Sequence, residues 1–196
     1  MHNDAINKLF ALAIEQSEIP EERELLEALR DGTDNIEVLE RLLAEEDFEN
    51  EEEEKNLYAL ISDMKLPEKI KLAMLGGKPA RSILIRDTNR QVQMFVLQNP
   101  KLSDNEINEY ARNTNLDDGV LREIGKNSTW MKNYSVKHGL VCNPKTPIDI
   151  SIRWLKYLKE KDLRMIAKSK NIPRVIGTQA NKLLQQRMKK SDGGGH

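Results

Sequence analysis

Cysteine is almost missing from this chain of 196 residues, which contains Cys142 alone. A disulfide framework, a cysteine-based zinc site and an iron–sulfur cluster are therefore excluded within a single chain. Aromatic residues make up only 5% of the sequence, and no apolar run approaches the roughly 18 residues of a membrane span. The first residues, MHNDAINKLF, lack the basic and apolar regions of a signal peptide. We therefore expect a soluble, cytoplasmic protein that binds no cofactor and no metal.

The sequence also lacks the two-residue alternation of apolar and polar residues that marks a strand, so it predicts no strand. Helix-forming residues dominate, and apolar residues recur at helical spacing. Three such stripes precede residue 65: Ile6, Leu9, Phe10 and Ala13; Ile36, Leu39 and Leu43; and Leu57, Leu60, Ile61 and Met64. The predicted fold class is all-α.

The net charge of −1 conceals a strong asymmetry along the chain. Residues 1–64 contain 20 acidic and 5 basic residues, a formal charge of −15. Residues 65–196 contain 12 acidic and 26 basic residues, a formal charge of +14. Such an asymmetry typically marks an interaction surface or an intramolecular partner.

The acidic run EEDFENEEEEKN, residues 45–56, has two interpretations. It is either a disordered acidic linker or a short loop followed by a helix. We favour the helix, because Asn50 is a suitable N-cap and Glu51–Glu54 would fill the first turn, where negative charge is favourable. Pro20, followed by two glutamates, predicts another helix start.

A degenerate repeat begins near residue 65. Its openings, LPEKIKLAM, LSDNEINEYA and TPIDISIRWL, each place Pro or Ser at a helix start. The triplet NPK, at 99–101 and 143–145, precedes the second and third openings, and we interpret it as the joint between units. Three helices are expected in each unit: 67–75, 79–87 and 89–98; 103–113, 117–127 and 129–142; and 147–158, 160–170 and 173–189.

Two phrases carry a family resemblance: IRDTNRQVQMFVLQNPKLSDNEINEYARN and WMKNYSVKHGLVCNPKTPIDISIRWL. Their shared cadence resembles the leucine-rich variant class of helical repeats and, more broadly, is similar to HEAT-like and armadillo-like repeats, including small bacterial proteins of this type. The resemblance covers about residues 66–188. It implies an architecture but no activity. The cysteine cluster that can precede leucine-rich variant repeats is missing, so no iron–sulfur role carries over.

The expected architecture is an α-solenoid of about three degenerate three-helix repeats preceded by an acidic helical region. Its expected domains are an acidic N-terminal region, 1–64, a basic repeat domain, 65–190, and a flexible tail, 191–196.

Catalytic signatures are weak. His138 and Cys142 lie four residues apart on one expected helix, which suits a catalytic dyad or half of a metal site, but also a packed helix face. Gly76-Gly77 lacks the spacing of a phosphate-binding loop and fits a helix end before a proline start. Asp117-Asp118 fits a helix start better than an acid–base pair. We therefore expect no enzyme.

The strongest candidate for binding is the basic stretch RWLKYLKEKDLRMIAKSKNIPR, residues 153–174. Its cations could bind phosphates or an acidic protein, and its exposed aromatic rings could stack on bases. The alternative is that the two rings pack between repeats while the cations form a solvated helix surface. The candidate surface comprises Lys132, Arg153, Trp154, Lys156, Tyr157, Arg164, Lys168 and Arg174.

We accordingly expect a scaffold or protein-interaction module whose partner is acidic. That partner could be the chain's own N-terminal region, acting in cis or in trans. Nucleic-acid binding is the alternative function, and no membrane partner is expected.

Overall fold

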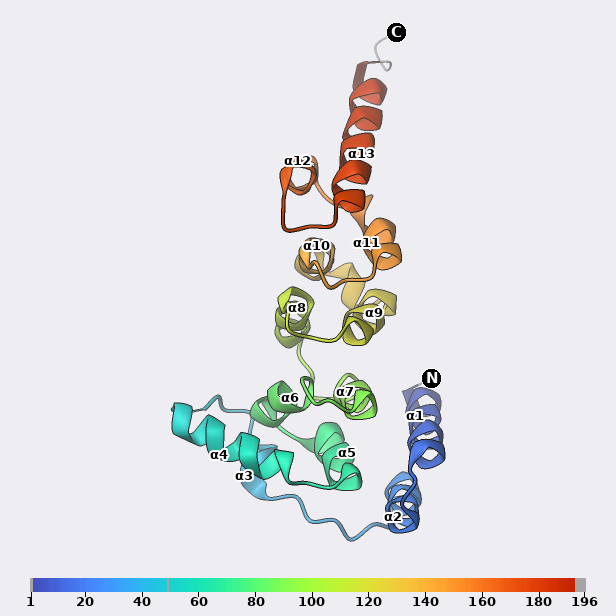
Figure 1. Cartoon of the computed structure of the whole chain (residues 1–196), viewed down its shortest axis with the longest axis vertical. Coiled ribbons are helices and arrows are strands. Elements are labelled where there is room, and N and C mark those ends of the chain that lie inside the picture. Colours follow the sequence, from blue (N-terminus) through green and yellow to red (C-terminus); the bar gives the residue numbers. More distant parts are fainter. Residues whose placement is uncertain (1, 49, 193–196) are drawn as a thin grey trace. The chain divides into compact units, whose positions relative to one another are not determined.

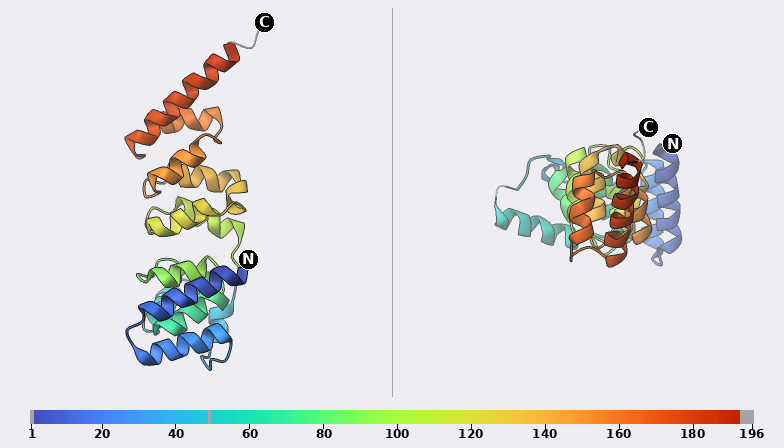
Figure 2. Two further views of the ribbon diagram at one scale, coloured as in Figure 1. Left: turned by 90° about the vertical axis from the view of Figure 1, so that its right-hand side faces the viewer. Right: turned by 90° about the horizontal axis from the view of Figure 1, so that it is seen from above.

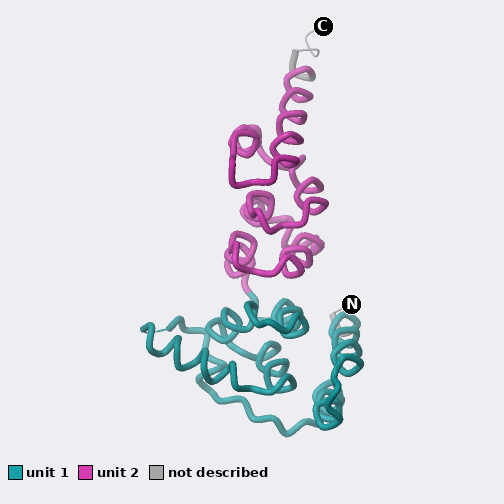
Figure 3. Tube along the Cα trace, viewed as in Figure 1, with its two compact units in different colours: residues 1–102 teal, residues 103–196 magenta. Residues whose placement is uncertain are grey.

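The computed structural model describes residues 2–48 and 50–192, and every regular element within them is a helix. The all-α prediction is therefore confirmed. Contacts between Cα atoms divide the chain into unit one, residues 1–102, and unit two, residues 103–196 (Figure 3). No helix in the described part is long and apolar enough to cross a membrane.

Unit one contains seven α-helices in its described residues (Figure 1). They are α1 (His2–Gln16), α2 (Pro20–Asp31), α3 (Glu40–Leu43), α4 (Glu51–Ser62), α5 (Leu66–Leu75), α6 (Lys78–Leu84) and α7 (Arg90–Val96). Helix α1 packs against α2 and α7, whereas α3 and α4 pack against α6. Phe10 of α1 meets Phe95 of α7 with ring centroids 4.8 Å apart. The N-terminal helices thus share a core with the first expected repeat.

The helix starts in unit one follow the expected capping chemistry. Pro20 opens α2, and the side chain of Asn50 accepts a hydrogen bond from the backbone N–H of Glu53, at 2.9 Å, at the start of α4. The stripe expected over 36–43 is mostly not helical, because α3 begins only at Glu40. The side chain of Asp34 accepts a hydrogen bond from the Ile36 N–H and forms a turn that competes with a helix there.

The pair Gly76-Gly77 separates α5 from α6, as expected. The requirement for glycine arises from close packing rather than from an unusual backbone angle. The Gly77 N–H donates to the Leu42 carbonyl at 2.8 Å, and a Cβ atom at Gly77 would lie 1.5 Å from the Ala44 carbonyl oxygen. The acidic segment before α4 is thereby docked onto the α5–α6 turn.

Unit two consists of short helices in its described residues. They are α8 (Asp104–Arg112), α9 (Asp118–Lys126), the 3-10 helix η1 (Trp130–Lys132), α10 (Tyr134–Cys142), α11 (Ile148–Leu155), α12 (Glu160–Lys168) and α13 (Arg174–Asp192). Helix α8 packs against α10, and α9 packs against α11. The long α13 packs against both α11 and α12 (Figure 2).

The nine helices expected from the three openings correspond to helices α5 to α13, with one interruption. The helix expected over 129–142 is divided at Asn133, which ends η1 and caps α10 by accepting a hydrogen bond from the Ser135 N–H. Helix α13 extends two residues into the expected tail 191–196, and residues 193–196 lie outside the described part.

The two NPK turns make hydrogen bonds of the same kind. After α7, the Asn99 side chain donates to the carbonyls of Ala73 and Gly76, at 2.9 and 3.1 Å, at the end of α5. After α10, the Asn143 side chain donates to the carbonyls of Ala111 and Asn113, at 3.1 and 3.0 Å, at the end of α8. Each asparagine side chain therefore donates hydrogen bonds to carbonyl groups at the C-terminal end of a neighbouring helix, where carbonyls lack partners within the helix.

Both asparagines are buried, and both also accept a hydrogen bond from the backbone N–H two residues later. At the end of α11, Arg187 of α13 takes over the donor role, bonding the carbonyls of Lys156 and Leu158 at 2.7 and 2.9 Å. The sequence predicted a turn at each NPK triplet. It did not indicate that the asparagine side chain would also bond the end of a second helix.

The division between compact units falls at 102/103, whereas the domain boundary predicted from the sequence was at 64/65. Unit one holds 22 acidic and 13 basic residues, and unit two holds 10 acidic and 18 basic residues. The charge asymmetry thus persists as −9 against +8. It is weaker than −15 against +14 because the helices α5 to α7 bring basic residues into unit one.

Candidate functional site

The two aromatic residues of the basic stretch have different environments. Trp154, near the end of α11, is half-buried, and its indole N–H donates to the Gly125 carbonyl of α9 at 2.8 Å. Tyr157, in the turn after α11, is 53% exposed. Their ring centroids lie 5.4 Å apart. Trp154 therefore supports the packing interpretation, whereas Tyr157 presents a ring to solvent.

Gly125 explains how Trp154 reaches the backbone of α9. A Cβ atom at Gly125 would lie 2.4 Å from Cγ2 of Ile150 on α11, so any larger residue would hold the two helices apart. The close approach brings the Gly125 carbonyl within hydrogen-bonding distance of the indole. This hydrogen bond holds the Trp154 ring in place beside the ring of Tyr157.

Two lysines flank the exposed Tyr157 ring. The ammonium of Lys156 lies 5.0 Å from the ring centroid, and that of Lys137, from α10, lies 5.9 Å away. Cation–π contacts at exposed sites contribute about 0.5–1 kcal/mol each. Arg153 is exposed one turn before Tyr157. Lys137 was absent from the predicted surface, because 20 residues of sequence separate it from Tyr157 and only the packing of α10 against α11 brings them together.

The turn that carries Tyr157 is held from two sides. From α10, the Tyr134 hydroxyl accepts a hydrogen bond from the Lys159 N–H at 2.9 Å and donates to the carboxylate of Asp162. From α13, Arg187 bonds the carbonyls of Lys156 and Leu158. Burial, and then the hydrogen bond to Asp162, raise the pKa of Tyr134, so this hydroxyl stays protonated at neutral pH.

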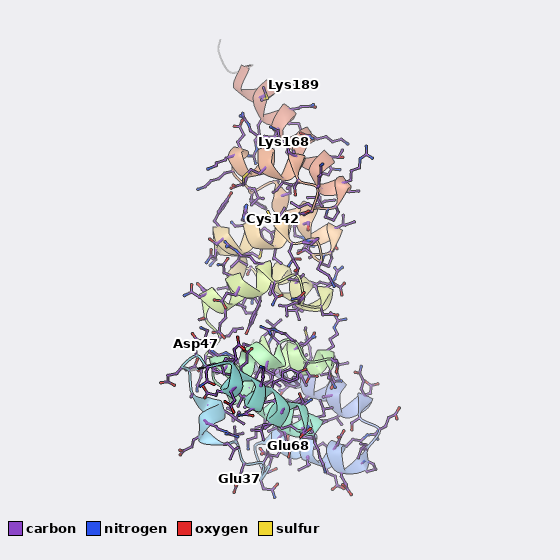
Figure 4. All side chains as sticks on the ribbon, turned by 60° about the vertical axis from the view of Figure 1, so that its left-hand side comes forward. Glu37, Asp47, Glu68, Cys142, Lys168 and Lys189 are labelled. Carbon is purple, nitrogen blue, oxygen red and sulfur yellow. The ribbon has the colours of Figure 1, made fainter. Side chains whose placement is uncertain are left out.

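The other predicted residues are exposed but lie apart from the aromatic pair. Lys132 lies on η1, Arg164 and Lys168 lie on α12, and Arg174 begins α13. Figure 4 labels Lys168. Arg164 forms an ion pair with Glu160 on its own helix, and the two side chains are 63% and 48% exposed. Such surface pairs contribute little to stability. Within the described part, no ring contact or hydrogen bond joins these four residues to Trp154 or Tyr157.

Positive charge is concentrated at this end of unit two. Residues 153–190 contain 12 basic and 2 acidic residues, whereas residues 103–152 contain 6 basic and 7 acidic ones. The two acids are Glu160, which pairs with Arg164, and Asp162, which accepts from Tyr134. The field around Tyr157 is therefore strongly positive, and it would attract anionic groups.

His138 and Cys142 do face each other, and the structure adds a carboxylate to them. Cys142 Sγ lies 3.6 Å from His138 Nε2, and Asp162 Oδ1 lies 3.9 Å from the same nitrogen. His138 and Cys142 line a cavity of about 240 Å³ together with Arg112 of α8. The third group that a catalytic triad requires is thus present.

The geometry of this cluster nevertheless argues against nucleophilic catalysis. A triad needs the thiol and the carboxylate on opposite imidazole nitrogens, whereas here Cys142 Sγ lies nearer to Nε2, the nitrogen that faces Asp162, at 3.6 Å, than to Nδ1, at 4.0 Å. Burial, and then the charge of Asp162, raise the pKa of the Cys142 thiol, whereas a nucleophilic cysteine needs a lowered pKa. Among the described residues, no group of three or more His, Cys, Asp or Glu is arranged to hold a metal ion.

In unit one, acidic residues of the N-terminal region neutralise cations of the first expected repeat. Arg81 of α6 is fully buried and bonds both carboxylate oxygens of Glu45, at 3.1 and 2.9 Å. Lys71 of α5 meets Asp34 at 2.5 Å. The hydrogen bond from Arg81 is the main reason that the pKa of Glu45 lies below its usual range.

Comparisons of the chain with protein-family models, curated proteins and solved structures found no match.

Proposed function

We propose that unit two is a non-catalytic binding module that recognises an acidic segment of a protein partner. The observation that supports this most directly is Tyr157, exposed on a fixed turn between Lys137 and Lys156. A ring flanked by two ammonium groups suits carboxylates that alternate with apolar or aromatic side chains. Because the turn is already held by Tyr134 and Arg187, little conformational entropy is lost on binding.

We further propose that the chain is a helical repeat protein of the HEAT-like or leucine-rich variant type, with an α-solenoid architecture. The matching hydrogen bonds of Asn99 and Asn143 support this proposal, since one sequence triplet performs one structural task in each of two units. In such an architecture each repeat contacts its neighbours, and the stacked helices offer an extended binding surface. The surface formed by Lys137, Arg153, Lys156 and Tyr157, here called the Tyr157 surface, would lie near the C-terminal end of that array.

The test is a titration of the full-length protein with a labelled glutamate-rich peptide, followed by fluorescence anisotropy. The double substitution Arg153→Glu/Lys156→Glu should weaken binding by about tenfold or more, because it reverses two charges beside the ring. Tyr157→Ala should weaken binding by about fivefold, corresponding to about 1 kcal/mol. The matched control Lys182→Glu/Lys189→Glu carries the same charge change on exposed sites of α13. Equal losses in the two double variants would refute a localised site.

Nucleic-acid binding is the second candidate, because Tyr157 could stack on a base while Arg153 and Lys156 bind phosphates. The −9 charge of unit one opposes it in the full-length chain. A single-stranded oligonucleotide in the same titration separates the two functions. Binding to it with a steep salt dependence between about 50 and 200 mM, and without affinity for the peptide, would favour nucleic acid.

A further inference from the structure

Helix α4 presents an acidic edge to solvent. Glu51–Glu54 are all exposed, and Tyr58 is 59% exposed. Glu51, Glu54 and Tyr58 are spaced three and four residues apart, so they lie along one side of the helix. The opposite side buries Leu57 and Ile61. This row of two carboxylates and an aromatic ring matches the acidic and aromatic composition proposed for the ligand of the Tyr157 surface.

The position of α4 leaves this edge accessible within its unit. Helices α1 and α2 pack against α7 and α5, whereas α4 packs against α6 and lies at the margin of unit one opposite to α1 and α2 (Figure 1). The neighbouring cations Lys71, Lys78 and Arg81 are already paired with Asp34, Asp47 and Glu45. On α4 itself, Glu51 forms an ion pair with Lys55 at 3.9 Å, and because both side chains are more than three-quarters exposed, Glu51 remains accessible to a second cation.

We propose that the acidic edge of α4 (Glu51, Glu54 and Tyr58) in one copy of the chain docks on the Tyr157 surface (Lys137, Arg153, Lys156 and Tyr157) of a second copy. This inference rests on the proposed function and names its acidic partner. Charge complementarity supports it, because unit one carries −9 and unit two carries +8. The two faces differ from each other, so the contact is heterologous and does not close into a symmetric dimer by itself.

A heterologous contact predicts open, concentration-dependent assembly. In sedimentation experiments at low salt, the average mass should rise continuously with concentration above the monomer mass of 22.6 kDa. In 1 M NaCl, where the screening length is about 3 Å, the mass should return to that of the monomer. A cis contact would keep the wild-type protein monomeric at every concentration and would overturn the proposal.

Complementary variants give the sharpest test. The acidic variant Glu51→Gln/Glu54→Gln and the basic variant Arg153→Glu/Lys156→Glu should each self-associate about tenfold or more weakly than wild type. An equimolar mixture should form a complex of two chains and stop there, since each variant keeps one intact face. The matched controls Glu21→Gln/Glu24→Gln and Lys182→Glu/Lys189→Glu should assemble like wild type. Failure of the mixture to associate overturns the proposal.

Two measurements separate the possible causes of failure. Because glutamates in the first turn also stabilise α4, Tyr58→Ala serves as a second variant on the same edge and should weaken assembly with unchanged helix content by circular dichroism. The glutamate-rich peptide is titrated in parallel. Peptide binding by a chain that stays monomeric overturns the second-copy inference alone. A monomer that fails to bind the peptide overturns the proposed function as well.

Discussion

Replacement of Asn143 by alanine should destabilise unit two strongly for so small a change. The side chain makes three hydrogen bonds: it donates to the carbonyls of Ala111 and Asn113 and accepts from the Lys145 N–H. At about 1 kcal/mol for each bond, with an added cost for the carbonyl groups left unpaired, the expected loss is about 2–4 kcal/mol. The site is 3% exposed, so water cannot readily replace the lost donors.

Asn113→Ala provides a matched control in the same unit. Asn113 ends α8, is half-buried, and its side chain makes one hydrogen bond, from the Asn115 N–H at 2.9 Å. Its loss should cost about 0.5–1.5 kcal/mol. The carbonyl that Asn143 bonds is retained in this variant.

Denaturant unfolding followed by tryptophan fluorescence measures both losses. The only two tryptophans, Trp130 and Trp154, lie in unit two, so this signal reports the unit that the substitution affects. Asn99→Ala should show a loss similar to Asn143→Ala when unfolding is followed by circular dichroism. If Asn143→Ala costs no more than Asn113→Ala, the bridging role of the NPK turn is wrong.

Three further predictions concern single sites. Gly125→Ala should destabilise unit two by about 1–2 kcal/mol, because the added Cβ would lie 2.4 Å from Cγ2 of Ile150. Gly177→Ala should be neutral or stabilising, because the atoms nearest to its added Cβ lie 3.6 Å away. Chemical denaturation of the two variants measures both effects. Burial alone would raise the pKa of Asp34, but hydrogen bonds from Lys71 and from the backbone lower it below its usual range. The ionised Asp34 side chain therefore stabilises the fold above about pH 4, and this contribution is lost as the pH falls through the lowered pKa. The difference in unfolding free energy between wild type and Asp34→Asn, measured by circular dichroism, should shrink in acid. A difference that stays constant with pH would contradict this. Alkylation of Cys142 by iodoacetamide at neutral pH should be slower than that of a free thiol, and a rate equal to or above the free-thiol rate would refute the raised pKa.

Local signals in the sequence were sufficient to predict most helices. Caps such as Asn50 and Pro20 act within one turn, so the sequence alone identifies them. The stripe over 36–43 misled the prediction because apolar spacing was counted while the turn-forming side chain of Asp34 was not. Lys71, from α5, then stabilises that turn through a contact 37 residues away.

The candidate surface was predicted in part, and what was missed depends on tertiary packing. The sequence placed Trp154 and Tyr157 together but could not show that one packs on Gly125 while the other stays exposed. Lys137 and Arg187 come from other helices, and nothing in their local sequence marks them. The approach of Asp162 to the nitrogen that faces Cys142 likewise depends on how α12 lies against α10.

The most direct test of the central claim is a titration in which Trp154 itself reports binding. In the variant Trp130→Phe, Trp154 is the single tryptophan, and its ring centroid lies 5.4 Å from that of Tyr157. A glutamate-rich peptide bound at the Tyr157 surface should change the Trp154 emission with the same dissociation constant that peptide anisotropy gives. The double substitution Arg153→Glu/Lys156→Glu should raise both dissociation constants together, by about tenfold or more. Binding that leaves the Trp154 emission unchanged and is insensitive to these two substitutions would contradict the account.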